Sequence, residues 1–243
     1  GFDVHRLVPK KNLYLEKAVQ ALYSDSIPPM RDENKTLITG DRLRRSRLYV
    51  PGNQPKKILK AGTYSPDCII LDLEDSVPQK EKDNARIIVR NALRMVDFNG
   101  AEKMVRINSN DTGMIDLEFI IAQNVHVILI PKVESSDQII RFVKKINELL
   151  KVCGRREPVF IIPIIESAHG VLNALEIAKS SPNIIGLTIG LEDYTADLGI
   201  NKTITGEESF FARSMVLHAA KATGIQALDS VHGDFRDEKS LRR

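Results

Sequence analysis

The chain has 243 residues, of which 42% are hydrophobic and 28% are charged, and its formal net charge is +3. This length and composition suit one large α/β domain or two small ones, and so small a net charge does not require a nucleic-acid partner. No apolar run reaches the roughly 18 residues that a transmembrane helix needs, so we expect no membrane partner. The two cysteines, Cys68 and Cys153, are far apart without metal-type spacing, which indicates reduced thiols in a cytoplasmic protein.

The first 45 residues fit no repeating pattern. They contain one possible helix at 12–24, followed by a turn-rich stretch at 25–41. We therefore assign residues 1–45 to an N-terminal extension or small subdomain, and residues 46–243 to the main domain.

From residue 47 onward, short apolar runs rich in Val, Ile and Leu alternate with segments of helical spacing. The apolar runs contain few polar residues, which is typical of strands buried on both faces of a parallel sheet. We expect seven strands, at 47–52, 68–74, 103–108, 125–132, 158–166, 183–190 and 224–231. The helical segments lie at 54–62, 78–96, 114–123, 136–153, 170–180 and 209–224.

Two α/β architectures fit this alternation. A doubly wound sheet usually places a glycine-rich turn after its first strand, and no G-x-G-x-x-G occurs here. A barrel instead places polar residues at the carboxyl ends of several strands. We therefore expect a (β/α)₈ TIM barrel with seven recognisable strands and the last strand missing from the sequence. The polar residues at the strand ends are Asp72, Glu74, Asp75, Arg106, Asn108, Lys132, Glu166, Glu192 and Asp193.

Glu166 and Asp193 form the candidate metal site. Each follows an apolar run, and the carboxyl ends of neighbouring parallel strands, about 5 Å apart, face the same rim. Two carboxylates that leave the other coordination positions to water suit Mg²⁺. They suit Ca²⁺ less well, if that ion is to be enclosed by protein ligands alone. The alternative is structural, with Glu166 capping a helix and Asp193 forming a surface ion pair.

Arg106 is the candidate substrate-binding residue. A guanidinium can bind a carboxylate through two parallel hydrogen bonds, so a metal with an arginine suggests a small carboxylate substrate. Arg106 could equally neutralise Glu74 or Asp75, and the two roles are compatible. Lys132 offers a rival chemistry, because a desolvated lysine in a barrel can form a Schiff base with a ketone.

The motifs that contain these residues resemble a known family. They are "LDLEDSVPQKEK", "VRINS", "ILIPKVES", "IPIIESAHG" and "GLEDYTADLG", and they occur in the order found in the HpcH/HpaI aldolase superfamily, which includes citrate lyase β subunits and the citryl-, malyl- and citramalyl-CoA lyases. The resemblance runs from about residue 44 to the end. It implies a modified TIM barrel, usually trimeric, that uses Mg²⁺ to cleave a carbon–carbon bond in an acyl thioester.

The resemblance also implies roles for individual residues. Glu166 and Asp193 match the metal ligands, Arg106 matches the arginine that binds the substrate carboxylate, and Glu74 and Asp75 match an acidic pair beneath the metal site. In the first strand and the turn after it, the residues expected to contact the thioester substrate are Arg47, Pro51 and Gly52. The alternative for the basic residues of this region is a solvated charged face.

The implied activity is Mg²⁺-dependent cleavage of a citryl thioester to oxaloacetate and an acetyl thioester. The thioester would be carried by CoA or by an acyl carrier protein, and the partners expected are two further copies of the chain and a citrate lyase α subunit. Alternatives are a malyl- or citramalyl-CoA lyase, or a relative that binds metal and CoA without turnover. Family members continue into an eighth strand and a C-terminal lid, which we expect to be missing from this sequence.

Overall fold

The computed structural model describes residues 9–31, 41–203, 205–232 and 236–242. The chain divides into two compact units. Unit 1 contains Gly1–Val127 and Leu149–Glu157, and unit 2 contains Ile128–Glu148 and Pro158–Arg243. None of the helices in the described ranges is both long and apolar enough to span a membrane.

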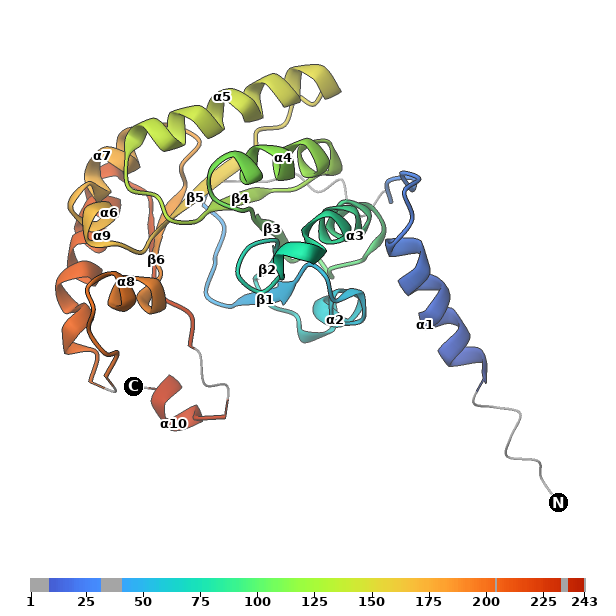
Figure 1. The fold of residues 1–243 in the computed structure, drawn as a ribbon, viewed down its shortest axis with the longest axis horizontal. Coiled ribbons are helices and arrows are strands. Elements are labelled where there is room, and N and C mark those ends of the chain that lie inside the picture. The colour runs from blue at the N-terminus through green and yellow to red at the C-terminus, as the bar shows by residue number, and fades with distance from the viewer. Residues whose placement is uncertain (1–8, 32–40, 204, 233–235, 243) are drawn as a thin grey trace. The chain divides into compact units, whose positions relative to one another are not determined.

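Unit 1 is built around three parallel strands in chain order. Its elements are α1 (Pro9–Leu22), β1 (Arg47–Pro51), α2 (Pro55–Ala61), β2 (Cys68–Asp72), α3 (Lys82–Met95), β3 (Glu102–Arg106) and α4 (Asn110–Ile120). Strand β2 pairs with β1 on one side and β3 on the other, and every one of its residues is buried. Helix α3 contacts both α1 and α4 (Figure 1). The continuous apolar run of β2 therefore reflects a central strand, as its sequence predicts.

Unit 2 repeats this arrangement. Its elements are β5 (Phe160–Ile165), α6 (Ala168–Leu172), α7 (Ala174–Lys179), β6 (Gly186–Ile189), α8 (Leu191–Asp197), α9 (Phe210–Thr223), β7 (Gln226–Leu228) and α10 (Glu238–Leu241). Strand β6 pairs in parallel with β5 and with β7, and α9 packs against β6, β7 and α7. Two further elements, β4 (Val127–Ile130) and α5 (Ser136–Cys153), contain residues of both units.

The N-terminal segment is fixed to α3 by side chains of that helix. Asn91 Nδ2 donates to the carbonyl oxygens of Leu22 and Ser24 at 3.1 and 2.8 Å, and Arg90 Nη2 donates to the carbonyl oxygen of Ser24 at 2.9 Å. Leu22 itself is fully buried. The proposed boundary at residue 45 stays a prediction, but residues 22–24 are closely packed on α3.

The expectation of a complete (β/α)₈ TIM barrel is wrong for this structure. The seven predicted strands all form, but the described residues contain no eighth strand. A barrel closes only when the last strand pairs with the first, and within the described ranges β1 pairs only with β2. The alternation of apolar runs predicts a parallel α/β sheet, which is present; it does not determine whether that sheet closes.

Candidate active site

Arg106 and Asp72 form the centre of the candidate site in unit 1. Asp72 ends β2, Arg106 ends β3, and the two residues are direct partners in the register of the parallel pair. Arg106 Nε lies 2.7 Å from Asp72 Oδ1, and Arg106 Nη2 lies 2.7 Å from Asp72 Oδ2. This two-point contact fixes the plane of the guanidinium.

Two further carboxylates approach the same guanidinium. Arg106 Nη1 lies 3.0 Å from Glu74 Oε2 and 3.2 Å from Asp75 Oδ2. Glu74 is buried, whereas the side chain of Asp75 is 54% exposed. On its other side, Arg106 lies over the ring of Tyr49 from β1, with the guanidinium carbon 5.5 Å from the ring centroid. The structure thus brings together the three residues predicted as catalytic, and adds Asp72 and Tyr49 to them.

These contacts keep the central pair ionised. Burial acts to raise the pKa of Asp72, but the hydrogen bonds and charge of Arg106, with the hydroxyl of Ser76, outweigh burial and lower that pKa. Burial likewise acts to lower the pKa of Arg106, and the hydrogen bond and charge of Asp72, followed by the charge of Glu74, raise it instead. The cluster is therefore a fixed arrangement of charges at the carboxyl end of the strands.

Gly52 and Pro51 lie at this same end, and Arg47 does not. Gly52 N–H donates to the carbonyl oxygen of Asp72 at 2.8 Å, and a Cβ atom on Gly52 would lie only 2.6 Å from that oxygen. The position requires glycine because the turn after β1 packs directly on the end of β2. Arg47 begins β1 and pairs with Cys68, so about 13 Å of strand separates it from Pro51.

Glu166 lies at the carboxyl end of β5 in unit 2. It follows Ile165, whose register partner is Ile189 of β6, so Glu166 stands beside Gly190. Its side chain is buried, and Oε1 accepts a hydrogen bond from Lys132 N–H at 2.6 Å. A Cβ atom on Gly190 would collide with the Glu166 carboxylate. The buried carboxylate is therefore positioned from two sides by backbone.

Asp193 lies in the first turn of α8, after β6, and is partly exposed. Its neighbour Glu192 is exposed and pairs with Lys202. Glu166 and Asp193 supply hard oxygen donors at the ends of adjacent parallel strands, which suits Mg²⁺ because this ion keeps several waters and needs few protein ligands. A cluster of three or more metal-binding side chains is not found among the described residues, so this site would offer two carboxylates.

Lys132 does not have the environment that a Schiff-base lysine needs. Its side chain is exposed, whereas such a lysine is activated by removal from water. Its backbone has a φ of 54°, in the left-handed region that residues with a side chain rarely adopt. That conformation accompanies the hydrogen bond that the Lys132 N–H donates to Glu166 Oε1.

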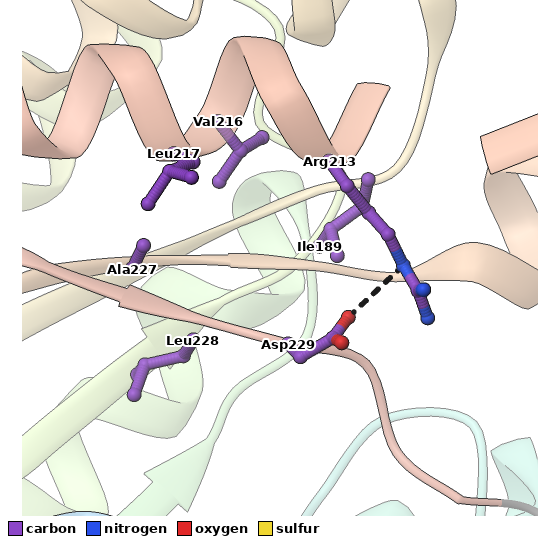
Figure 2. A pocket seen from close by; sticks show the side chains of 7 residues that line it. All are labelled: Ile189, Arg213, Val216, Leu217, Ala227, Leu228 and Asp229. Carbon is purple, nitrogen blue, oxygen red and sulfur yellow. Dashed lines mark ion pairs between the residues drawn. The ribbon is translucent and has the colours of Figure 1, made fainter. Parts of the chain in front are cut away.

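Unit 2 also contains a pocket of about 220 Å³ between α9 and the strands β6 and β7 (Figure 2). Arg213 Nε and Asp229 Oδ1 form an ion pair of 3.2 Å in its wall. The other lining residues are apolar, and they are Ile189, Val216, Leu217, Ala227 and Leu228. None of the predicted site residues lines this pocket, and no sequence motif pointed to it.

Comparison with known proteins places these motifs in a family. The family model described as HpcH/HpaI aldolase/citrate lyase matches residues 45–243. The chain is 40% identical over 211 residues to the citrate lyase subunit beta of Leuconostoc mesenteroides subsp. cremoris, which covers 85% of this chain and 69% of that protein. It is 38% identical over 213 residues to the mitochondrial citramalyl-CoA lyase of Mus musculus, covering 82% of this chain and 63% of that protein.

Solved structures give the same result. The citrate lyase beta subunit from M. tuberculosis, complexed with oxaloacetate and magnesium, has a TM-score of 0.66 and 32% identity, and the match covers 82% of this chain and 85% of that chain. The Mycobacterium tuberculosis protein CitE in complex with magnesium, acetoacetate and coenzyme A has a TM-score of 0.66 and 33% identity, covering 82% of this chain and 71% of that one. The resemblance seen in the sequence is confirmed, and the chain belongs to the HpcH/HpaI aldolase/citrate lyase family.

Proposed function

We propose that this protein is a Mg²⁺-dependent carbon–carbon lyase that cleaves a citryl thioester to oxaloacetate and an acetyl thioester, acting as the β subunit of a citrate lyase. The observation that carries the proposal is the 40% identity to a citrate lyase subunit beta over 85% of the chain. The magnesium and oxaloacetate in a solved relative support the choice of metal and product.

Glu166 and Asp193 would hold the metal ion in this proposal. When bound, Mg²⁺ supplies a positive charge that polarises a substrate oxygen and stabilises the negative charge that develops on it. Lys132 N–H and the close approach of Gly190 orient the Glu166 carboxylate, so that one metal ligand is in place before the metal arrives.

Arg106 would bind a carboxylate of the citryl group. Asp72 holds the guanidinium from one edge, and Glu74 and Asp75 contact Nη1. Asp75 makes the longer of those two contacts and is the exposed one, so a substrate carboxylate can replace it at Arg106 while Glu74 stays in place.

The proposed cleavage breaks one carbon–carbon bond of the citryl group. The hydroxyl of the citryl group loses its proton, and its carbon becomes the carbonyl carbon of oxaloacetate. The bond to the thioester α-carbon breaks, and its electron pair leaves with that carbon as the thioester enolate, which a proton then converts to the acetyl thioester. Arg106 would contribute by binding a substrate carboxylate, and Glu166 and Asp193 would contribute by holding the metal ion.

A citramalyl-CoA lyase is the second candidate, because the mouse protein of that name is 38% identical to this chain. Malyl-CoA cleavage, and binding of metal and CoA without turnover, are further alternatives. In the favoured case we propose a cytoplasmic homotrimer that works with a citrate lyase α subunit and a carrier, either CoA or an acyl carrier protein. Coenzyme A in a solved relative supports a thioester of this type. Pro51 and Gly52 remain proposed contacts for the thioester; Arg47 stays a prediction, and its place at the opposite end of β1 does not support it.

A cleavage assay by mass spectrometry tests the proposal. The purified protein is incubated with citryl-, malyl- and citramalyl-CoA, each with and without Mg²⁺. We expect oxaloacetate and acetyl-CoA from citryl-CoA, at a rate that chelation abolishes. Preferred turnover of citramalyl-CoA would favour the second candidate. No cleavage of any of the three at high enzyme concentration would refute the lyase, and cleavage unaffected by chelation would refute the metal assignment.

A further inference from the structure

Helix α3 has a row of basic residues that the proposed function does not use. Lys82, Arg86, Arg90 and Arg94 follow one another at intervals of four, so they lie along one face of the helix. The first three are only 9%, 5% and 9% exposed. Cations are rarely buried unless they are paired, so each of these side chains must have a structural partner.

The partners differ along the helix. Arg86 Nε binds Asp116 Oδ1 at 2.6 Å, Arg90 binds backbone carbonyls of the N-terminal segment, and Arg94 Nη1 binds the side chain of Gln123 at 2.6 Å. Lys82 differs in its partner: its Nζ donates to the carbonyl oxygens of Leu73 and Glu74, each at 2.9 Å. These two residues belong to the segment that carries the acidic side chains to Arg106.

The segment 73–76, here called the acidic loop, is held by several hydrogen bonds to its backbone. The Leu73 carbonyl accepts a second hydrogen bond from Asn108 Nδ2 at 2.9 Å. The N–H groups of Glu74 and Ser76 donate to the two carboxylate oxygens of Asp72 at 3.0 and 3.1 Å. Lys82 is thus the contact that joins two consecutive carbonyls of the loop to the first residue of α3.

We propose that Lys82 is a positioning residue, which holds the acidic loop so that Glu74 keeps Arg106 in the orientation that binds the substrate carboxylate. This inference rests on the proposed function, because it assigns Arg106 to a substrate carboxylate. It adds a residue that touches neither the metal ligands nor the guanidinium.

Helix stability alone does not account for a cation at this place. The amino terminus of a helix carries a partial positive charge, which favours acidic residues and disfavours lysine in the first turn. Burial lowers the pKa of Lys82, while the charges of Asp116, Glu74, Asp72 and Asp75 act to raise it. A lysine here is therefore disfavoured by the helix dipole and by burial. The two hydrogen bonds that it donates to the acidic loop offset these costs.

The test compares Lys82→Met with Lys80→Met in the full chain. Lys80 is exposed two residues away, so the control has the same substitution without the buried contact. Affinities for oxaloacetate in the presence of Mg²⁺, and for Mg²⁺ alone, are measured by titration calorimetry. For Lys82→Met we expect oxaloacetate to bind at least about tenfold more weakly, with Mg²⁺ affinity unchanged, and for Lys80→Met we expect neither to change.

A double-mutant cycle with Arg106→Lys separates positioning from general destabilisation. If Lys82 acts through Arg106, adding Lys82→Met to Arg106→Lys should weaken oxaloacetate binding little further. If Lys82 has only a structural effect, the two losses of oxaloacetate affinity should add in full, and that result would overturn the inference. Should Lys82→Met not fold, Lys82→Gln, which keeps an N–H donor on a shorter stem, is expected to weaken oxaloacetate binding in the same direction.

The two proposals fail in different ways. If the native protein and Lys82→Met bind oxaloacetate equally well, the inference about Lys82 is overturned and the proposed function is not. Native protein that neither binds oxaloacetate nor cleaves a thioester overturns the proposed function, and the inference with it.

Discussion

Arg106 and Asp72 occupy matching positions at the carboxyl ends of two paired parallel strands and are joined by two hydrogen bonds of 2.7 Å. Because the strand register itself brings the two side chains together, the guanidinium is oriented by the sheet. The loop carboxylates of Glu74 and Asp75 then complete its surroundings. Arg106 is thus held in place before any substrate arrives, which reduces the entropy lost on binding.

The first prediction concerns Arg106→Lys. A lysine keeps the positive charge but cannot make the two-point contact with Asp72. We expect the KM for the citryl thioester to rise by roughly tenfold or more, because the positive charge is no longer held in a fixed orientation by Asp72. Steady-state kinetics measures this effect. Arg242→Lys is the control, since Arg242 forms an exposed pair with Glu238 at 2.6 Å and should show no change. An unaltered KM in Arg106→Lys would remove Arg106 from substrate binding.

The second prediction concerns the metal ligand Glu166. Glu166→Gln removes the charge and keeps the shape, so we expect Mg²⁺ binding to be lost while the thermal midpoint stays close to that of the native protein. Gly190→Ala should weaken Mg²⁺ binding although it replaces neither proposed ligand, because its new Cβ displaces the Glu166 carboxylate. Calorimetric titration with Mg²⁺ measures both. Glu192→Gln, at an exposed residue paired with Lys202, is the control. Native Mg²⁺ affinity in Glu166→Gln would place the ion elsewhere.

The strands of this fold are predictable from the sequence because buried parallel strands are continuous apolar runs. All seven expected runs overlap a strand. The helices are less predictable from the sequence. The single helix expected at 170–180 is in fact two short helices, α6 and α7, separated by Asn173. Helix α8 was not expected, because its seven residues are too few to show a helical period.

The candidate site is only partly predictable for a related reason. Strand ends identify Arg106, Glu166 and Asp193 as residues of interest, but pairing between strands is set by register, which the sequence does not display. The sequence therefore suggests Glu74 or Asp75 as the acid beside Arg106, whereas the two-point partner in the structure is Asp72. Lys82 was missed because a lysine in a helix is normally exposed, and only its contacts with the acidic loop reveal that it is buried.

The third prediction distinguishes the two cysteines. Cys68 is fully buried beside Glu102, and burial, followed by the charge of Glu102, raises its pKa to about 12. Cys153 is exposed. Because the thiolate is the reactive form, an aromatic disulfide reagent at pH 8 should modify one thiol in the native protein and two after unfolding. Cys153→Ser should abolish the native reaction, and Cys68→Ala should leave it intact. Two equivalents in the native protein would contradict the burial of Cys68.

The fourth prediction concerns acid stability and His126. This side chain is 1% exposed, its Nδ1 accepts a hydrogen bond from Lys103 N–H at 3.2 Å, and its Nε2 has no partner among the described residues. Burial, together with the charges of Lys103, Arg42 and Arg155, lowers its pKa to about 3. The folded protein therefore keeps His126 neutral at a pH where the unfolded chain binds a proton.

The sign and window of the effect follow from that difference. Above a pH of about 6.5, His126 is neutral in both the folded protein and the unfolded chain, and its contribution to the free energy of unfolding is fully present. That contribution is lost as the pH falls toward 3. The slope is about 1.4 kcal/mol of unfolding free energy per pH unit in the middle of this window. Urea unfolding at pH 7.5, 6.0 and 5.0 measures it. His126→Gln should flatten the decline, whereas His218→Gln, at an exposed histidine on α9, should preserve it. An equally steep decline in His126→Gln would mean that another group binds the proton.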